Sequence, residues 1–501
     1  MQQVNRVVNR LSPNTCNEQV VLSCDLAGEH PLYIFLDEKG AYLLYSLSLT
    51  DLLEHSDVKN SLTISDTGMS FLLQCGVVPP PLTIYKNLFV VGIGDSAQVA
   101  ICSGRIKLSF SHDFPFMSTK RLCNDQMRPS EDFILESIAQ AVVARADSSK
   151  PSFLFHSAGK DSNTIALALA EAGWQDRFTL ITHKAKSGED EGEISAKIAK
   201  QLGFRHRFLR EVETLDRGRI ECIDEYFYGS PLPCVDNVSL AYPLYLHSNP
   251  DLRHSNIIDG GGNDTYMSTP LSRKDWLVFG VSRLLSRLAF LRGGISTESV
   301  VCPGLRTAPE WCGMSGLSLK DASSIFPATT SVYGYWQSEL QKRSAWDLLD
   351  FKTDIYSTVT ISEMHIRKAR NFCDAFSSNL IMPFADPDIA QYFSSMPESY
   401  LVDRKKGTNK LLLRHMLKER IGLDSDSIGK KGWVVNHDKI VANNMDYMKN
   451  EIFSCTLWGK PGIETLVSRF EGAARGSGWR ARTSLRMLYR LFLISGWYNA
   501  K

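Results

Sequence analysis

The sequence contains no closely spaced cysteine pair and no cysteine spacing of the kind that holds a metal, although 11 cysteines occur among its 501 residues. Scattered thiols in an odd number predict reduced cysteines rather than a disulfide framework, which is typical of a cytoplasmic protein. The opening residues, MQQVNRVVNRLSPN, lack the apolar core of a signal peptide. No stretch reaches the roughly 18 apolar residues of a membrane span, so we expect no membrane partner.

The sequence also has almost no net charge. Its formal charge is +1 at pH 7, from 56 Lys and Arg against 55 Asp and Glu. A chain without an excess of positive charge is not expected to attract nucleic acid or an anionic membrane surface. The length predicts two or three domains, and a composition of 43% hydrophobic and 22% charged residues is normal for a globular protein.

The hydrophobic pattern divides the chain near residue 125. Residues 1–125 contain short apolar or alternating runs separated by Gly, Asp and Asn, which predict a β-rich domain. In residues 126–501, strand-like runs such as SFLF, FTLITHK and NIID alternate with helical stretches of 10 to 15 residues. This alternation predicts an α/β domain with a doubly wound parallel sheet. Beyond about residue 270 the pattern is mostly helical, so we expect helical C-terminal additions.

One loop between a predicted strand and a predicted helix carries most of the expected chemistry. This first loop (residues 157–162) consists of Ser157, Ala158, Gly159, Lys160, Asp161 and Ser162. Small residues beyond the carboxyl end of a parallel strand, before a helix N-terminus, predict an anion cradle of backbone N–H groups. Because a carboxylate cannot bind phosphate directly, Asp161 suggests a bridging Mg²⁺. The loop matches neither GxxxxGK[ST] nor GxGxxG.

Ser-Ala-Gly-Lys-Asp-Ser resembles the pyrophosphate loop S-G-G-x-D-S of the N-type ATP pyrophosphatases, with Ala158 in place of one glycine. Later stretches resemble the asparagine synthetase and β-lactam synthetase family within that group, in the same order along the chain. These are IIDGGGNDTY (residues 257–266), LIMPFADPDIAQYF (residues 380–393), GTNKLLLRHML (residues 407–417) and GKKGW (residues 429–433). Asp386 and Lys410 match family positions and could equally be structural.

The resemblance implies an enzyme that activates a carboxylate as an acyl-adenylate, releases pyrophosphate from ATP, and lets an amine attack the acyl carbon. It implies two cofactors, ATP and Mg²⁺. Pyrophosphate would bind to the first loop and to Gly260 and Gly262 of a second loop (residues 259–264), and adenine would lie against Ile181 and His183. Asp161 and Asp264 would hold Mg²⁺. Lys431, with Lys430 as the nearby alternative, would stabilise charge at the α-phosphate.

The N-terminal region departs from the family pattern. Glutamine-dependent members carry a cysteine directly after the initiator methionine, where its own α-amino group acts as base. Here Gln2 occupies that position, and Cys16, the first cysteine, has no free α-amino group. We therefore expect residues 1–125 to form a short, degenerate glutaminase-like domain that does not hydrolyse glutamine.

The positions that hold the general base in this family also differ in this chain. The family places Glu or Tyr in the second loop and a carboxylate just before the Pro-Phe-x-Asp segment, and these positions hold Gly261 and Asn379 here. Glu363 and His365, in ISEMHIRKAR, are the candidates that remain. A lone Glu or His on a helix is more often a surface residue, so both interpretations stay open.

Without ammonia from glutamine, we expect the attacking amine to belong to the substrate. The leading prediction is an intramolecular amide-forming ligase of specialised metabolism, such as antibiotic biosynthesis, that closes a β-lactam. The alternatives are a lasso-peptide cyclase that forms a macrolactam, an enzyme that amidates a sugar carboxylate with free ammonia, and a nucleotide-binding pseudoenzyme. The expected partner is a small-molecule or peptide carboxylate, and the protein could form a homodimer.

Overall fold

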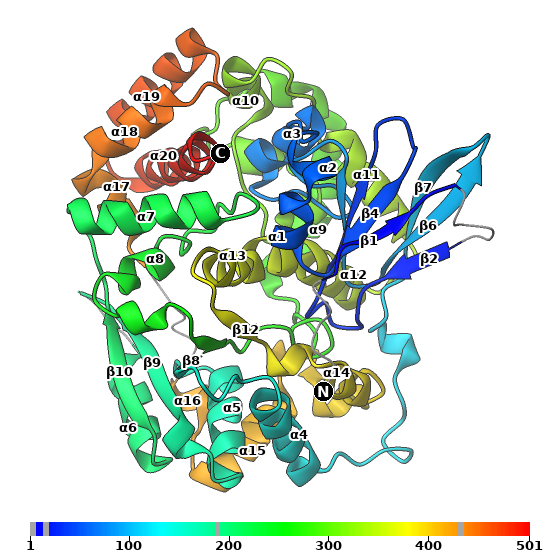
Figure 1. Ribbon diagram of the computed structural model, residues 1–501, viewed down its shortest axis with the longest axis vertical. Helices are drawn as coiled ribbons and strands as arrows, with labels where there is room; N and C mark the ends of the chain where they lie inside the picture. The colour runs from blue at the N-terminus through cyan, green and yellow to red at the C-terminus, as the bar shows by residue number, and fades with distance from the viewer. Residues whose placement is uncertain (1–6, 14–19, 187–190, 429–434) are drawn as a thin grey trace.

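A five-stranded parallel sheet lies in the lower half of the molecule in the view of Figure 1. The computed structural model describes residues 7–13, 20–186, 191–428 and 435–501. The strand order is β10-β9-β8-β11-β12, and each neighbouring pair is parallel. The strands are β8 (Ser152–Phe155), β9 (Phe178–Lys184), β10 (Arg205–Arg210), β11 (Asn256–Ile258) and β12 (Asn379–Ile381). The predicted alternation of strands and helices is therefore confirmed for these elements.

Alternate residues of these strands pack into two different cores. Phe153 and Ile257 belong to one buried cluster, and Leu154 and Ile258 belong to another. Because successive side chains of a strand point to opposite faces, both faces of the sheet are covered. This explains why the strands read as continuous apolar runs rather than as alternating ones.

Different helices supply the two cores. The cluster of Leu154 includes residues of α4 (Glu131–Val143), α5 (Lys160–Glu171), α6 (Gly192–Gln201), α14 (Pro387–Ser394) and α15 (Leu411–Ile421). The cluster of Phe153 includes residues of α7 (Arg217–Gly229), α8 (Ala241–Leu246), α10 (Leu319–Ile325), α13 (Arg367–Ala375) and four C-terminal helices. These four are α17 (His437–Asn443), α18 (Met445–Ser454), α19 (Lys460–Ala474) and α20 (Gly478–Asn499).

In its described residues, the N-terminal part contains two antiparallel sheets, which confirms the β-rich pattern, and three α-helices. One sheet has the order β1-β4-β3-β5 and the other β2-β6-β7. The strands are β1 (Asn9–Leu11), β2 (Val20–Ser23), β3 (Leu32–Leu36), β4 (Leu43–Ser46), β5 (Leu88–Val91), β6 (Asp95–Cys102) and β7 (Arg105–His112). The helices are α1 (Leu49–Glu54), α2 (Ser56–Lys59) and α3 (Asp66–Cys75).

The described residues contain four further α-helices and one small antiparallel ribbon. These are α9 (Arg273–Leu285), α11 (Tyr333–Lys342), α12 (Leu348–Ile355), α16 (Ser425–Ile428), and the strand pair β13 (Val402–Asp403) and β14 (Thr408–Asn409). Between α12 and α13 the chain is π-helical from Tyr356 to Ile366. Within the described ranges, no helix is long and apolar enough to span a membrane, and every cysteine there is a free thiol.

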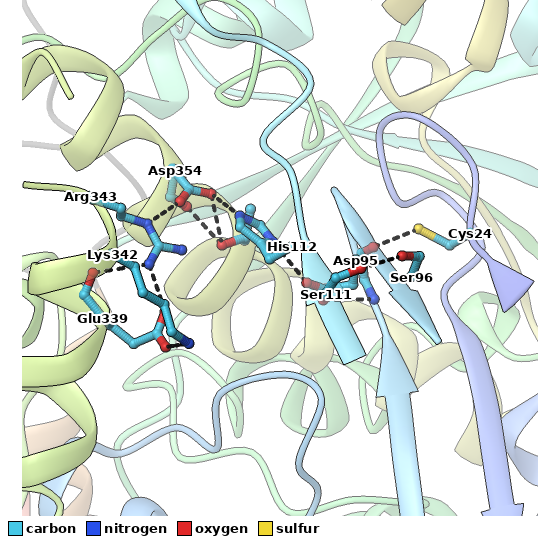
Figure 2. A network of polar contacts seen from close by, with 11 residues as sticks. Cys24, Asp95, Ser96, Ser111, His112, Glu339, Lys342, Arg343 and Asp354 are labelled. Atoms are coloured by element: carbon cyan, nitrogen blue, oxygen red, sulfur yellow. Dashed lines mark hydrogen bonds and ion pairs between the residues drawn. The ribbon is translucent and has the colours of Figure 1, made fainter. Parts of the chain in front are cut away.

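A network of charged side chains joins the N-terminal sheet β2-β6-β7 to helices α11 and α12 (Figure 2). His112, at the end of β7, places Nδ1 2.7 Å from Asp95 Oδ1 and Nε2 3.0 Å from Asp354 Oδ1. Asp354, on α12, also accepts a hydrogen bond of 2.6 Å from Arg343 Nε. Arg343 in turn pairs with Glu339 at 2.6 Å. The His112 imidazole thus links Asp95 on β6 to α12, and Arg343 extends the network to Glu339 on α11.

Candidate active site

The first and second loops lie side by side at one edge of the parallel sheet. They follow β8 and β11, which are paired with Leu154 opposite Ile258. From β8 the chain builds β9 and β10 on one side and then returns to add β11 and β12 on the other. In open parallel sheets, ligands bind beyond the carboxyl ends of the strands at the point where the order reverses. The structure therefore brings both predicted loops to the expected ligand position.

The first loop is held in shape by its own side chains. Ser157 Oγ accepts a hydrogen bond from the Gly159 N–H at 3.0 Å, and Ser162 Oγ accepts one from the Ser157 N–H at 3.2 Å. Asn163 Nδ2 donates to the carbonyl oxygens of Ser157 at 3.0 Å and Gly159 at 2.6 Å. Sequence reasoning did not single out Asn163, which is fully buried and whose Oδ1 lies 2.9 Å from His156 Nε2.

A carboxylate of the protein itself lies against this loop. The Ala158 N–H donates to Glu191 Oε2 at 3.0 Å, and Glu191 is 7% exposed. The loop therefore already presents a backbone donor to an anion, as the cradle prediction requires. Sequence reasoning missed Glu191 because it is one of several acidic residues in EDEGEI, and nothing in that run distinguishes it.

The two aspartates predicted to hold a metal converge on one lysine. Lys410 Nζ lies 2.7 Å from Asp161 Oδ2 and 3.0 Å from Asp264 Oδ1. Asn263 accepts from the same ammonium group at 2.9 Å and donates to Asp161 Oδ1 at 2.6 Å. Burial by itself lowers the pKa of Lys410, but the charges of Asp161 and Asp264 outweigh it and raise that pKa. The lysine is therefore held as a cation between two carboxylates.

Two glycines allow close approach where the two loops meet. A Cβ on Gly260 would lie 3.1 Å from Asp161 Cβ, so a side chain there would press on the first loop. Gly262 has φ +102, and a Cβ there would lie 2.9 Å from Ala385 Cβ. Both positions allow the second loop to approach its neighbours at backbone distance.

The donor set suits Mg²⁺ when phosphates supply the remaining ligands. Asp161 and Asp264 are the carboxylates that would hold it, and their side chains are 29% and 30% exposed. Within the described residues, no group of three or more His, Cys, Asp and Glu side chains could hold a metal alone. Mg²⁺ commonly uses one or two carboxylates together with substrate phosphates, so this pair fits that role.

The residues predicted to face adenine lie on the strand beside the first loop. Ile181 and His183 belong to the carboxyl half of β9, and the Ile181 carbonyl accepts the His156 N–H at 2.8 Å. Both side chains are buried. His183 Nδ1 lies 2.8 Å from the Tyr245 hydroxyl.

The two candidate bases differ in their surroundings. Glu363 accepts a 2.7 Å bond from Arg367, which also donates to the Tyr33 hydroxyl at 3.0 Å, so this carboxylate belongs to a buried ion pair. His365 Nε2 lies 3.6 Å from Asp236 Oδ2, and the His365 side chain is 35% exposed. His365 is therefore the more exposed of the two candidate side chains.

A line of charged groups leads from the second loop toward His365. Asp259 Oδ1 accepts the Gly261 N–H at 2.8 Å. Burial raises the pKa of the Asp259 carboxyl group, and the charge of Asp161 adds to this, whereas Lys368 opposes it. Lys368 Nζ pairs with Asp236 Oδ1 at 3.1 Å. Nothing in the sequence marks Asp259 or Asp236 as a site residue. Asp259 only follows a strand, and Asp236 only lies in a loop.

The structure does not place the remaining predicted positions at the two loops. Lys430 and Lys431 fall outside the described residues. Asn379 begins β12 at the amino edge of the sheet, where its Nδ2 donates to the Arg145 carbonyl at 2.9 Å, so it does not face the loops. Asp386 caps α14 and pairs with Arg145 at 2.6 Å, which is a structural role.

Comparison of the sequence with models of known protein families and with curated proteins finds no match. The assignment to the asparagine synthetase and β-lactam synthetase family therefore remains a prediction from motifs and from the geometry of the two loops.

Proposed function

We propose that the protein is an ATP-dependent ligase that adenylates a carboxylate, releases pyrophosphate and forms an amide bond. One observation carries this proposal. Asp161 and Asp264, from loops far apart in the sequence, meet at one cation beside a loop that presents backbone N–H donors. The strand order and the helices on both faces support a doubly wound synthetase fold of the asparagine synthetase type.

Several residues would act together in the first step, the adenylation of the carboxylate. The N–H groups of the first loop would donate to phosphate oxygens once the Glu191 carboxylate moves away from Ala158. Bound Mg²⁺ would neutralise charge on the phosphates. Asp161 and Asp264 would exchange their contact with the Lys410 ammonium group for that metal, which leaves Lys410 free to contact a phosphate oxygen.

His365 is the proposed base of the second step. As a neutral imidazole it would take a proton from the attacking amine, and Asp236 would stabilise the imidazolium that forms. Lys368 holds Asp236 in place from the other side.

Cys24 of the N-terminal region is not suited to be a nucleophile for glutamine hydrolysis. Cys24 Sγ donates to the carbonyl oxygens of Asp25 at 3.1 Å and Gly92 at 3.0 Å. Burial raises the pKa of this thiol, and the charges of Asp25 and Asp95 add to the increase. A buried thiol of this kind is a poor nucleophile. We propose that the attacking amine belongs to the substrate and that the product is an intramolecular amide, a β-lactam in the leading form.

The test is ATP–pyrophosphate exchange with Mg²⁺ across amino-acid-derived carboxylates and short peptides, with mass spectrometry for the loss of one water. Exchange and water loss with a small β-amino acid derivative would support lactam formation, and activity confined to peptides would support a macrolactam. If the purified chain does not bind Mg²⁺–ATP in calorimetry, the ligase proposal is wrong.

A further inference from the structure

Helix α9 has an apolar face that the rest of the described chain leaves uncovered. Leu277, Val281 and Leu284 follow one another at spacings of four and three residues, so they lie on one side of the helix. Leu277 is 68% exposed, Leu284 is 67% exposed, and Val281 and the neighbouring Trp276 are exposed as well. A row of large apolar side chains is thus presented to solvent.

The opposite side of α9 makes the contacts that hold the helix on the protein. Phe279 is buried, and its ring lies edge-on to that of Phe351 on α12, with the two centroids 5.7 Å apart. Ser282 is also buried and donates to the Phe279 carbonyl at 3.0 Å. Asp275 pairs with Lys352 of α12 at 2.9 Å. The helix is therefore docked on the protein without the exposed row.

The exposed apolar surface continues beyond the end of α9. Phe290, in the 3₁₀ turns that follow the helix, is 76% exposed. Val300 and Val301 are exposed too, and they come just before a turn that lies against the helix, since a Cβ on Gly304 would lie 3.5 Å from Leu285 Cδ1. Two segments thus present apolar side chains at the C-terminal end of α9.

The same stretch carries an excess of positive charge, although the net charge of the whole chain is only +1. Residues 273–292 contain five basic residues and one acidic residue, namely Arg273, Lys274, Arg283, Arg287, Arg292 and Asp275. Asp275 and Arg292 are paired with residues elsewhere in the protein. Arg273 and Lys274 are exposed, and no described residue forms an ion pair with either of them. The apolar row therefore begins beside two cations that lack a counter-charge.

An anionic lipid surface matches both features. Basic amphipathic helices with Trp, Phe and Leu on the apolar face lie in the plane of a membrane interface, where the cations meet lipid phosphates. A second copy of the chain matches less well, because a two-fold contact would bring the same cations of both copies together. Side chains exposed by two thirds project from the surface and do not line a groove of the kind that holds a partner helix.

We infer that the face of α9 formed by Leu277, Val281 and Leu284, with the cations Arg273 and Lys274, binds the surface of an anionic lipid bilayer. The helix would lie on the bilayer with its apolar row in the boundary between headgroups and acyl chains. This inference revises the expectation, drawn from the overall charge, that the protein has no membrane partner. It is independent of the proposed function, since none of these residues belongs to the candidate active site.

The test is co-sedimentation of the full chain with vesicles of equal parts phosphatidylglycerol and phosphatidylcholine. We expect saturable binding that weakens as the salt concentration rises, and much weaker binding to vesicles of phosphatidylcholine alone. The double variant Leu277→Asn/Leu284→Asn should bind about 10-fold or more weakly, because two apolar side chains no longer leave water. Arg273→Gln/Lys274→Gln should weaken binding about 10-fold or more and reduce its salt dependence.

Tyr228→Asn on α7 and Arg480→Gln/Arg482→Gln on α20 change exposed side chains elsewhere and are the matched controls, which should bind like the wild type. Both α9 variants should keep the wild-type melting temperature, since the changed side chains are exposed. The inference is wrong if the wild type does not bind anionic vesicles, if it binds neutral vesicles equally well, or if both α9 variants bind like the wild type.

Sedimentation velocity without lipid tests the second copy as the occupant of this face. A wild-type dimer that Leu277→Asn/Leu284→Asn converts to a monomer, without vesicle binding by the wild type, would assign the face to self-association and overturn the inference. Vesicle binding by a wild type that shows no ATP–pyrophosphate exchange and no ATP binding would overturn the proposed function alone.

Discussion

At the scale of single residues, the cation between Asp161 and Asp264 is the central feature of the site. We expect Asp161→Asn and Asp264→Asn each to reduce ATP–pyrophosphate exchange about 100-fold or more, because a charged metal ligand is lost. Each single variant should stay folded, since Lys410 keeps one carboxylate partner. The double variant should lose about 3 kcal/mol of unfolding free energy, because a buried ammonium group is left unpaired.

Asp125→Asn provides the control for these variants, since Asp125 is exposed and lies outside both loops. Exchange rates and urea denaturation measure the two effects. Wild-type exchange in both single variants would show that the aspartates do not hold the metal.

Glu191 competes with phosphate for the Ala158 N–H. We expect Glu191→Gln to tighten Mg²⁺–ATP binding about 10-fold, because a like charge beside the phosphates is removed while an amide oxygen can still accept the N–H. Calorimetry measures this affinity. Glu193→Gln is the matched control, because the Glu193 side chain is 72% exposed. Weaker binding by Glu191→Gln would show that the carboxylate supports the loop rather than blocking it.

His365 acts in the second step only, according to the proposal. His365→Asn should therefore lower amide formation about 100-fold or more and leave ATP–pyrophosphate exchange near the wild-type rate. Asp236→Asn should shift the pH profile of amide formation, because the imidazolium loses its stabilising charge. Loss of exchange together with amide formation in His365→Asn would contradict the role of this side chain as a base.

At the scale of elements, the His112 network fixes β6 and β7 to α11 and α12 (Figure 2). Burial alone lowers the pKa of His112, but the bonds to Asp354 and Asp95 outweigh it and raise the pKa to about 10. The ordinary value is near 6.5. A raised folded-state pKa means that the stabilisation is complete below pH 6.5 and is lost as the pH rises toward 10.

We therefore expect the melting temperature of the wild type to fall between pH 7 and 10 more steeply than that of His112→Gln. At pH 7 the variant should lose about 3 kcal/mol, since one partner of a largely buried charge network is removed. Differential scanning calorimetry over this pH range measures both effects. His247→Gln, at an exposed histidine, is the control. Equal pH slopes in His112→Gln and the wild type would refute the assignment.

At the scale of the whole molecule, the N-terminal sheets and the C-terminal helices share one core. Tyr33 and Phe35 of β3 belong to the same buried cluster as Leu491 and Phe492 of α20. Arg370 Nη2, on α13, also donates to the Gly28 carbonyl at 2.6 Å. The two regions that differ in sequence pattern are therefore joined by apolar burial as well as by polar contacts.

Because of this shared core, we expect a fragment of residues 126–501 to expose apolar surface and to fail to unfold cooperatively. Dye binding and thermal unfolding by circular dichroism measure this, with the full-length chain as the reference. A fragment that unfolds cooperatively and binds Mg²⁺–ATP like the full chain would show that residues 1–125 are dispensable for folding.

The sequence by itself determined the local elements of the sheet domain and the two loops. Strand-like apolar runs, helical periodicity and glycine-rich loops depend on interactions between near neighbours along the chain, so β8, β9, β11 and α5 lie where the pattern indicates. The predicted convergence of Asp161 and Asp264 follows from the rule that the carboxyl ends of parallel strands share one edge.

Only the tertiary structure decided which side chains meet across long sequence separations. Lys410 between the aspartates, Glu191 on the first loop and Asp236 beside His365 all come from segments that folding brings together. A single charged residue in an acidic or basic stretch carries no local signal of its partner. These residues belong to the site because of burial and charge pairing. Both arise only when the sheet and its helices pack.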